Sequence, residues 1–251
     1  MSYRFVRHPR EGEGPSESRS SAREQDGSSS PRGRRVCRAP RGIFAAAVAV
    51  LCTFVLPIPA FAAESEELDR RIERFLQSRE GTWRDLNVPD VDGRTLKDLI
   101  VKHGFKNALE IGTSTGHSAI WIAWGLSKTG GKLTTIEIDP ERYKIALQHF
   151  KEAGVSDYID ARLADAHELV PQLSDSYDFV FSDADKEWYT KYFQAVWPKM
   201  PAGGCFTAHN VTMSGSGIRE FLAHLETLKD GETTIDQKSR AGLSITCKKS
   251  R

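Results

Sequence analysis

Residues 108–118, with the sequence ALEIGTSTGHS, decide the fold. The apolar run at 108–111 predicts a short buried strand, and an apolar helix is expected directly after it, over 118–126. Gly112 and Gly116 lie between the two elements, where glycine lets the backbone turn sharply and approach a ligand closely. The pattern is E-x-G-x-x-x-G, not the G-x-G-x-x-G of dinucleotide-binding folds, and a tight structural turn would also produce it.

Strand and helix patterns alternate along the chain on the C-terminal side of this motif. A sheet with helices on both faces is the expected result of such alternation, and a final strand pair without a helix between its members must be antiparallel. The sequence therefore predicts an α/β fold: a doubly wound, mostly parallel, seven-stranded sheet with an antiparallel C-terminal hairpin. The expected strands are 108–111, 133–138, 158–163, 177–182, 204–209, 233–235 and 243–247, and the expected helices are 64–79, 92–103, 118–126, 140–153, 166–173, 187–197 and 217–228.

The N-terminal quarter of the 251-residue chain has a different composition. Residues 1–41 are rich in serine, arginine and glycine and predict a disordered basic leader. Residues 42–62 carry no charge and predict the hydrophobic region of a signal peptide, cleaved before Ala63, or a membrane anchor. We therefore expect one domain over 63–251 that is exported to the periplasm or membrane-anchored, with membrane contact only through the N-terminal segment. The formal net charge is +1, and no basic-aromatic stripe predicts nucleic-acid binding.

Ligands of doubly wound sheets bind beyond the carboxyl ends of the strands, so the residues just after each strand are the candidates for function. Glu137 ends the second strand, where a carboxylate can accept hydrogen bonds from two adjacent ribose hydroxyls. Ala166 follows the third strand, where small residues leave room for a flat ring. Asp165 beside it can accept from an exocyclic amine, or simply cap the next helix.

A second group of polar residues follows the fourth and fifth strands. Asp183, Asp185 and Lys186 stand after the fourth strand, and His209 and Asn210 after the fifth. Because neighbouring parallel strands end at the same edge, Asp183, His209 and Asn210 can converge on one divalent metal ion. An internally hydrogen-bonded His-Asp pair without metal is the alternative.

Together, the segments EIGTSTGHS, FSDADKEWY and GGCFTAHN and the Glu137 strand end resemble the cation-dependent O-methyltransferases, the group of catechol and caffeoyl-coenzyme A methyltransferases. The similarity extends from about Val88 to the C-terminus. It implies a Rossmann-like methyltransferase domain that transfers a methyl group from S-adenosylmethionine to a phenolic or catechol-like hydroxyl of a small-molecule acceptor. It also implies that the helix over 64–79 packs on a partner subunit in a homodimer.

The resemblance assigns roles to particular positions. Lys186 becomes the general base and, with Asp183, the catalytic pair, and Ser214 takes a substrate-binding position. Asp183, His209 and Asn210 take the metal-ligand positions. The positions implied for the cofactor are Val88, Glu110, Gly112, Thr113, Ser118, Glu137, Ala166 and Asp185.

His209 departs from the family pattern, which usually has aspartate before the asparagine. A neutral imidazole removes one negative charge from the site and favours Mn²⁺, Fe²⁺, Co²⁺ or Zn²⁺ over Mg²⁺, or loss of the metal. The cofactor assignments do not depend on this position.

Two other functions compete with methyl transfer. Residues 112–116 also satisfy G-x-S-x-G, so Ser114, Asp183 and His209 could form the triad of an exported α/β-hydrolase. A non-catalytic binding protein is the other alternative, since S-adenosylmethionine is made in the cytosol and the leader directs the domain outward. Cys205 and Cys247 are expected on neighbouring antiparallel strands, either close enough to form a disulfide or as two small buried apolar side chains.

Overall fold

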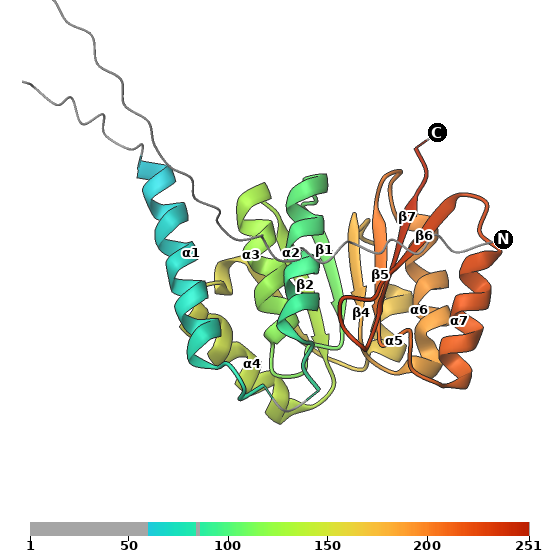
Figure 1. The fold of residues 1–251 in the computed structure, drawn as a ribbon, viewed down its shortest axis with the longest axis horizontal. Helices are drawn as coiled ribbons and strands as arrows, with labels where there is room; N and C mark the ends of the chain where they lie inside the picture. Colours follow the sequence, from blue (N-terminus) through green and yellow to red (C-terminus); the bar gives the residue numbers. More distant parts are fainter. Residues whose placement is uncertain (1–59, 84–85, 251) are drawn as a thin grey trace, which may run out of the picture. The chain divides into compact units, whose positions relative to one another are not determined.

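The structure, a computed structural model, describes residues 60–83 and 86–250 (Figure 1). The predicted leader, 1–41, lies outside the described residues, and so does all but the end of the predicted apolar segment 42–62. Helix α1 (Ala60–Ser78) includes the last three residues of that segment and continues through the predicted cleavage position. Within the described part of the chain, no helix is both long and apolar enough to cross a membrane.

The described residues form a seven-stranded sheet in the order β3-β2-β1-β4-β5-β7-β6. The first five strands are parallel, and β7 runs antiparallel between β5 and β6. The predicted fold class is therefore confirmed. The strands are β1 (Asn107–Ile111), β2 (Lys132–Glu137), β3 (Ile159–Leu163), β4 (Phe179–Ser182), β5 (Cys205–His209), β6 (Gly231–Asp236) and β7 (Leu243–Lys248). The helices after α1 are α2 (Asp90–His103), α3 (His117–Thr129), α4 (Pro140–Ala153), α5 (Ala166–Gln172), α6 (Tyr189–Val196) and α7 (Ser216–Glu226).

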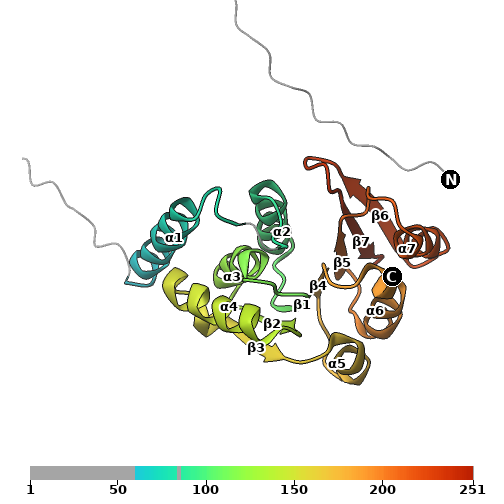
Figure 2. The ribbon, with the colours of Figure 1, turned by 90° about the horizontal axis from the view of Figure 1, so that it is seen from below.

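Alternate residues of the central strands face two separate apolar cores. Phe179 and Phe181 belong to the core beneath α1 to α4, whereas Val180 belongs to the core beneath α5 to α7. Figure 2 shows the two groups of helices on opposite faces of the sheet. This arrangement follows from the period of two in strand side chains, and it buries nearly continuous apolar strands on both faces.

Helix α3, the first crossover helix, packs closely against α2. A Cβ on Gly93 of α2 would lie only 2.2 Å from the Trp121 ring of α3, so glycine is required at this contact. Trp121 and Trp124 of α3 are both buried. The packing holds the N-terminus of α2 beside the carboxyl end of β5, and this placement brings Asp92 to the site described below.

Cys205 and Cys247 lie directly opposite each other on β5 and β7 and form a disulfide. Their Cα atoms are 4.1 Å apart, and 42 positions separate them along the chain. The prediction that the two thiols are close enough to bridge is confirmed. The bond ties β7, the last strand along the chain, to β5, the strand that ends in His209.

We predict that reduction of this disulfide lowers the free energy of unfolding by about 2–4 kcal/mol, because an open loop of this length leaves the unfolded chain more conformational freedom. Urea unfolding followed by tryptophan fluorescence, with and without reductant, measures the difference. The Cys205→Ser/Cys247→Ser double variant is the control. Its unfolding midpoint should equal that of the reduced wild type and should not change when reductant is added. Equal midpoints for oxidised and reduced wild type would contradict the prediction.

Candidate active site

A cavity of about 640 Å³ opens beyond the carboxyl ends of the parallel strands. It lies where the chain order reverses, since β1 continues to β2 on one side and has β4 as its neighbour on the other. Eight residues to which the resemblance assigns a role line it: Gly112, Glu137, Ala166, Asp183, Asp185, Lys186, His209 and Asn210. The predicted location of the functional site is therefore occupied by a cavity of the size that small-molecule ligands need.

The loop after β1 approaches the end of β4 so closely that only glycine fits. Gly112 has a φ of 97°, and an added Cβ would lie 2.9 Å from the carbonyl oxygen of Asp183. The Asp183 amide in turn donates to Ile111 O at 2.9 Å. Because of these contacts, the glycine loop and the polar residues after β4 form one wall of the cavity.

Glu137 organises the floor of the cavity through backbone amides. Its Oε2 accepts from the Ser114 amide at 2.6 Å, and its Oε1 accepts from the Ile138 and Asp139 amides at 3.1 and 2.9 Å. Asp139 caps α4, as expected of an acid at a helix N-terminus. Asp165 likewise accepts from the His167 amide and caps α5. Glu137 therefore combines a structural role with a carboxylate that faces the cavity.

Glu110 lies behind the glycine loop and is completely buried. Thr135 Oγ1 donates a hydrogen bond to its Oε2, whereas its Oε1 has no hydrogen-bond partner among the described residues. Burial raises the pKa of Glu110 from 4.5 to about 8. A buried carboxyl with one unsatisfied oxygen is costly to keep, so Glu110 stays a candidate functional position.

We predict that Glu110 makes the protein less stable as pH rises from about 4.5 to about 8. Over this range the unfolded chain loses its Glu110 proton while the folded protein keeps it, so ionisation favours unfolding, by up to about 1.4 kcal/mol per pH unit. The side chain of the Glu110→Gln variant cannot lose a proton. The stability of the variant relative to wild type should therefore increase as pH rises from about 4.5 to about 8 and stay constant above about pH 8. Urea unfolding of both proteins at a series of pH values tests this, and a pH-independent difference would refute it.

Asp183 and Lys186 form an ion pair at the rim of the cavity. Asp183 follows β4, and Lys186 begins a short 3₁₀ helix that leads into α6. The Lys186 Nζ atom donates to Asp183 Oδ1 at 2.6 Å and to the Ala184 carbonyl oxygen at 3.0 Å. About one third of the lysine side chain is exposed, so its amine can reach a molecule in the cavity.

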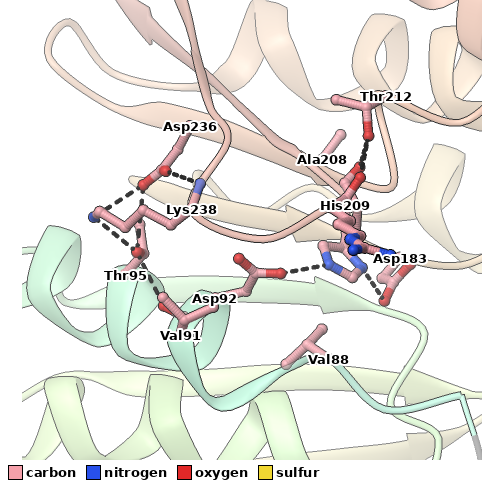
Figure 3. A network of polar contacts seen from close by, with 12 residues as sticks. Val88, Val91, Asp92, Thr95, Asp183, Ala208, His209, Thr212, Asp236 and Lys238 are labelled. Carbon is pink, nitrogen blue, oxygen red and sulfur yellow. Dashed lines mark hydrogen bonds and ion pairs between the residues drawn. The ribbon is translucent and has the colours of Figure 1, made fainter. Parts of the chain in front are cut away.

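His209, at the end of β5, has carboxylates at both of its ring nitrogens (Figure 3). Its Nδ1 lies 3.1 Å from Asp183 Oδ2, and its Nε2 lies 2.9 Å from Asp92 Oδ2. Burial alone would lower the pKa of His209, but the hydrogen bonds with Asp183 and Asp92 outweigh it and raise the pKa to about 9. The two carboxylates that flank the ring therefore favour the protonated form of His209.

Asp92 is a site residue that the sequence did not indicate. It lies in the first turn of α2 and is 3% exposed. Acidic residues are common in a first helical turn because they interact favourably with the helix dipole, so the sequence pattern gave no reason to treat Asp92 as more than that. Its partner is 117 residues away in the chain, and only the fold brings the two together.

A family model described as O-methyltransferase matches residues 61–229. The chain belongs to the O-methyltransferase family. It is 34% identical over 139 residues to a catechol O-methyltransferase from Niastella koreensis, and the match covers 54% of this chain and 62% of that protein. It is 31% identical over 167 residues to a caffeoyl-CoA O-methyltransferase from Eucalyptus gunnii, with 63% and 67% covered. The chain thus spans less than two thirds of the Niastella relative's length.

Solved structures of O-methyltransferases share the fold. The O-methyltransferase TomG from Streptomyces achromogenes, solved in complex with SAM, has 25% sequence identity and a TM-score of 0.61, over 76% of this chain and 96% of that one. An O-methyltransferase from Bacillus cereus gives the same TM-score at 24% identity, over 78% and 94%.

Within this O-methyltransferase, four positions implied for the cofactor do not line the cavity. Glu110, Thr113 and Ser118 are buried, and none of them lines the cavity. Val88 is also buried, and its carbonyl oxygen lies 2.8 Å from His117 Nδ1. The neighbouring Leu86 and Asn87 line the cavity instead.

The predicted substrate residue Ser214 is exposed and does not line the cavity either, whereas the adjacent Met213 does. The turn after β5 carries the chain away from the sheet, and one position along such a turn is enough to change which side chain faces the cavity. Asn210, at the start of the turn, lines the cavity with a left-handed φ of 60°.

The geometry does not favour the hydrolase alternative. A serine triad requires a histidine nitrogen at the nucleophile, and here both ring nitrogens of His209 contact carboxylate oxygens. Only β1 precedes Ser114 within the described residues, as the sequence had indicated.

Proposed function

We propose that the protein transfers the methyl group of S-adenosylmethionine to a phenolic or catechol-like hydroxyl of a small molecule. The observation that carries this proposal is the Lys186–Asp183 pair, which lies at the rim of a cavity that also holds the glycine loop and Glu137. Membership of the O-methyltransferase family supports it, as do the names of the catechol and caffeoyl-CoA relatives and the SAM complex of TomG.

The bound cofactor would supply an electrophilic methyl group for an in-line displacement. Such a reaction depends chiefly on holding the nucleophilic oxygen close to the methyl carbon. Glu137 would accept hydrogen bonds from the ribose hydroxyls at the end of β2. Lys186 would hydrogen-bond the acceptor oxygen, pass one of its own protons to Asp183 Oδ1, and take the hydroxyl proton of the acceptor in its place.

A divalent cation does not fit the donor atoms that the structure brings together. One oxygen of Asp183 faces Lys186 and the other faces His209, and both ring nitrogens of His209 face carboxylates. Asn210 is the one predicted ligand left, and among the described residues no group of three histidine, cysteine, aspartate or glutamate side chains is arranged to hold a metal. We therefore assign no step of the reaction to a metal.

Calorimetric titration of the full chain with S-adenosylmethionine tests the cofactor half of the proposal, and transfer of labelled methyl to simple phenols and catechols tests the acceptor half. We expect micromolar binding that Glu137→Ala weakens, and labelled product with at least one acceptor class. Absence of cofactor binding would refute the proposed function. Binding without methyl transfer to any phenol or catechol would favour the non-catalytic alternative.

We also propose that the domain resides in an oxidising compartment. The uncharged segment 42–62 and the Cys205–Cys247 bond both support this location, since disulfides persist mainly outside the reducing cytosol. Alkylation of free thiols in intact cells, followed by mass spectrometry, is the test. We expect both cysteines to be protected, and quantitative alkylation of the pair would refute this location.

A further inference from the structure

Four charged side chains converge at the cavity wall and balance one another. Asp92 and Asp183 supply two negative charges, and Lys186 and the protonated His209 supply two positive ones. The side chains of Asp92 and His209 are each 4% exposed and that of Asp183 is 11% exposed, so water screens these charges poorly. Buried charges are tolerated when they are paired and hydrogen-bonded, and here each carboxylate has a cationic partner.

The protonation of His209 follows from the positions of its neighbours. A carboxylate oxygen lies at hydrogen-bond distance from each ring nitrogen, 3.1 Å from Nδ1 and 2.9 Å from Nε2. A neutral ring has one N–H group and one lone pair, so one of the two carboxylates would face a lone pair. The doubly protonated ring donates to both carboxylates, and it is the form that satisfies this arrangement.

The ring is also held in place from several directions. The His209 carbonyl oxygen accepts a hydrogen bond from the buried Tyr189 hydroxyl at 3.1 Å, and β5 pairs with β4 and β7 on either side. Asp92 holds Nε2 from the first turn of α2, which the Gly93–Trp121 contact seats against α3. For a metal ion to bind both Asp183 and His209, the hydrogen bond between His209 Nδ1 and Asp183 Oδ2 would have to be broken.

We propose that the His209 ring, held between Asp92 and Asp183, occupies the place of a divalent cation, so that the residues present do not bind a metal. The inference rests on the proposed function, because it concerns how the same site keeps Asp183 and Lys186 in position for methyl transfer. Asp92 and His209 are positioning residues in this arrangement.

A gain-of-function variant tests the inference without a measurement of activity. His209→Asp replaces the cation with a third carboxylate beside Asp92, Asp183 and Asn210, a set of oxygen ligands that suits Mn²⁺. His209→Asn removes the ring without adding charge and is the matched control. Free Mn²⁺ is followed by electron paramagnetic resonance as the chelator-treated full-length proteins are titrated, with circular dichroism to verify folding.

We expect no saturable Mn²⁺ binding by wild type, and binding by His209→Asp that is about tenfold or more tighter than by His209→Asn. Stoichiometric Mn²⁺ binding by wild type that Asp183→Asn abolishes would overturn the inference, and so would equal binding by the two folded His209 variants.

Nitrogen-15 spectra of wild type at neutral pH provide a second test that does not depend on the folding of any variant. We expect both His209 nitrogens to carry protons and to be unchanged by Mg²⁺, and one unprotonated nitrogen would overturn the inference. Both tests stand even if no methyl transfer is found, so the inference and the proposed function can fail separately.

Discussion

Lys186→Ala is expected to lower kcat for methyl transfer by about 10²–10⁴-fold while leaving the affinity for S-adenosylmethionine nearly unchanged. The reason is the position of its amine: Asp183 holds it at 2.6 Å, at the rim of the cavity where the acceptor oxygen must lie. The cofactor contacts proposed for Glu137 are on another strand end and do not depend on the lysine. Single-turnover rates with labelled cofactor, together with calorimetric affinities, separate the two effects.

Lys191→Ala is the matched control for this variant. Lys191 lies close in sequence, but its Nζ is 4.0 Å from the centre of the Trp188 ring and it does not line the cavity. Its substitution removes the same charge and should leave the rate within about a factor of two, as expected for an exposed side chain away from the reaction. If the Lys186→Ala variant transferred the methyl group as fast as the Lys191→Ala variant, Lys186 would have no role in the mechanism.

Asp92→Asn is expected to lower the free energy of unfolding by about 3–5 kcal/mol at neutral pH, because it leaves the buried His209 cation with one carboxylate instead of two. The effect should depend on pH. The pKa of His209 is 6.5 in the unfolded chain and about 9 in the folded protein, so its protonation stabilises wild type fully below about pH 6.5. That contribution is lost as pH rises towards 9, and the difference between the two proteins should shrink.

Asp160→Asn provides the comparison for an exposed ion pair. Asp160 pairs with Arg162 at 2.8 Å, but both side chains are at least one third exposed. Its loss should therefore cost about 1 kcal/mol or less. Urea unfolding of the three proteins between pH 6 and pH 9 makes the measurement. An Asp92→Asn protein that loses no more stability than Asp160→Asn would show that the buried network contributes little.

The sequence alone predicted most of the fold because the signals are local. Apolar runs of four to six residues, each followed by a helical pattern, led to the correct order of strands and helices. The antiparallel C-terminal pair followed from the absence of a helix between its strands. Boundaries were less accurate: β6 extends over Gly231–Asp236, beyond the expected 233–235, because its backbone pairs with β7 along its whole length.

The candidate site was predicted in part, for the same physical reason. Parallel strands end at one edge, so Asp183, Lys186, His209 and Asn210 were expected together, and all four line the cavity. Ser214 was expected to bind the substrate, but it does not line the cavity. The direction of a side chain in a turn depends on backbone angles that composition does not reveal.

The features of this protein therefore fall into two groups with different origins. The doubly wound sheet and the glycine loop after β1 follow from patterns within short stretches of sequence, because local periodicity and turn chemistry specify them. The charge state of His209 depends on Asp92, 117 residues away on a helix that precedes the sheet. Only the packing of α2 against α3 brings that carboxylate to the ring. The folded structure, rather than any motif, thus decides that the site contains an imidazolium between two carboxylates.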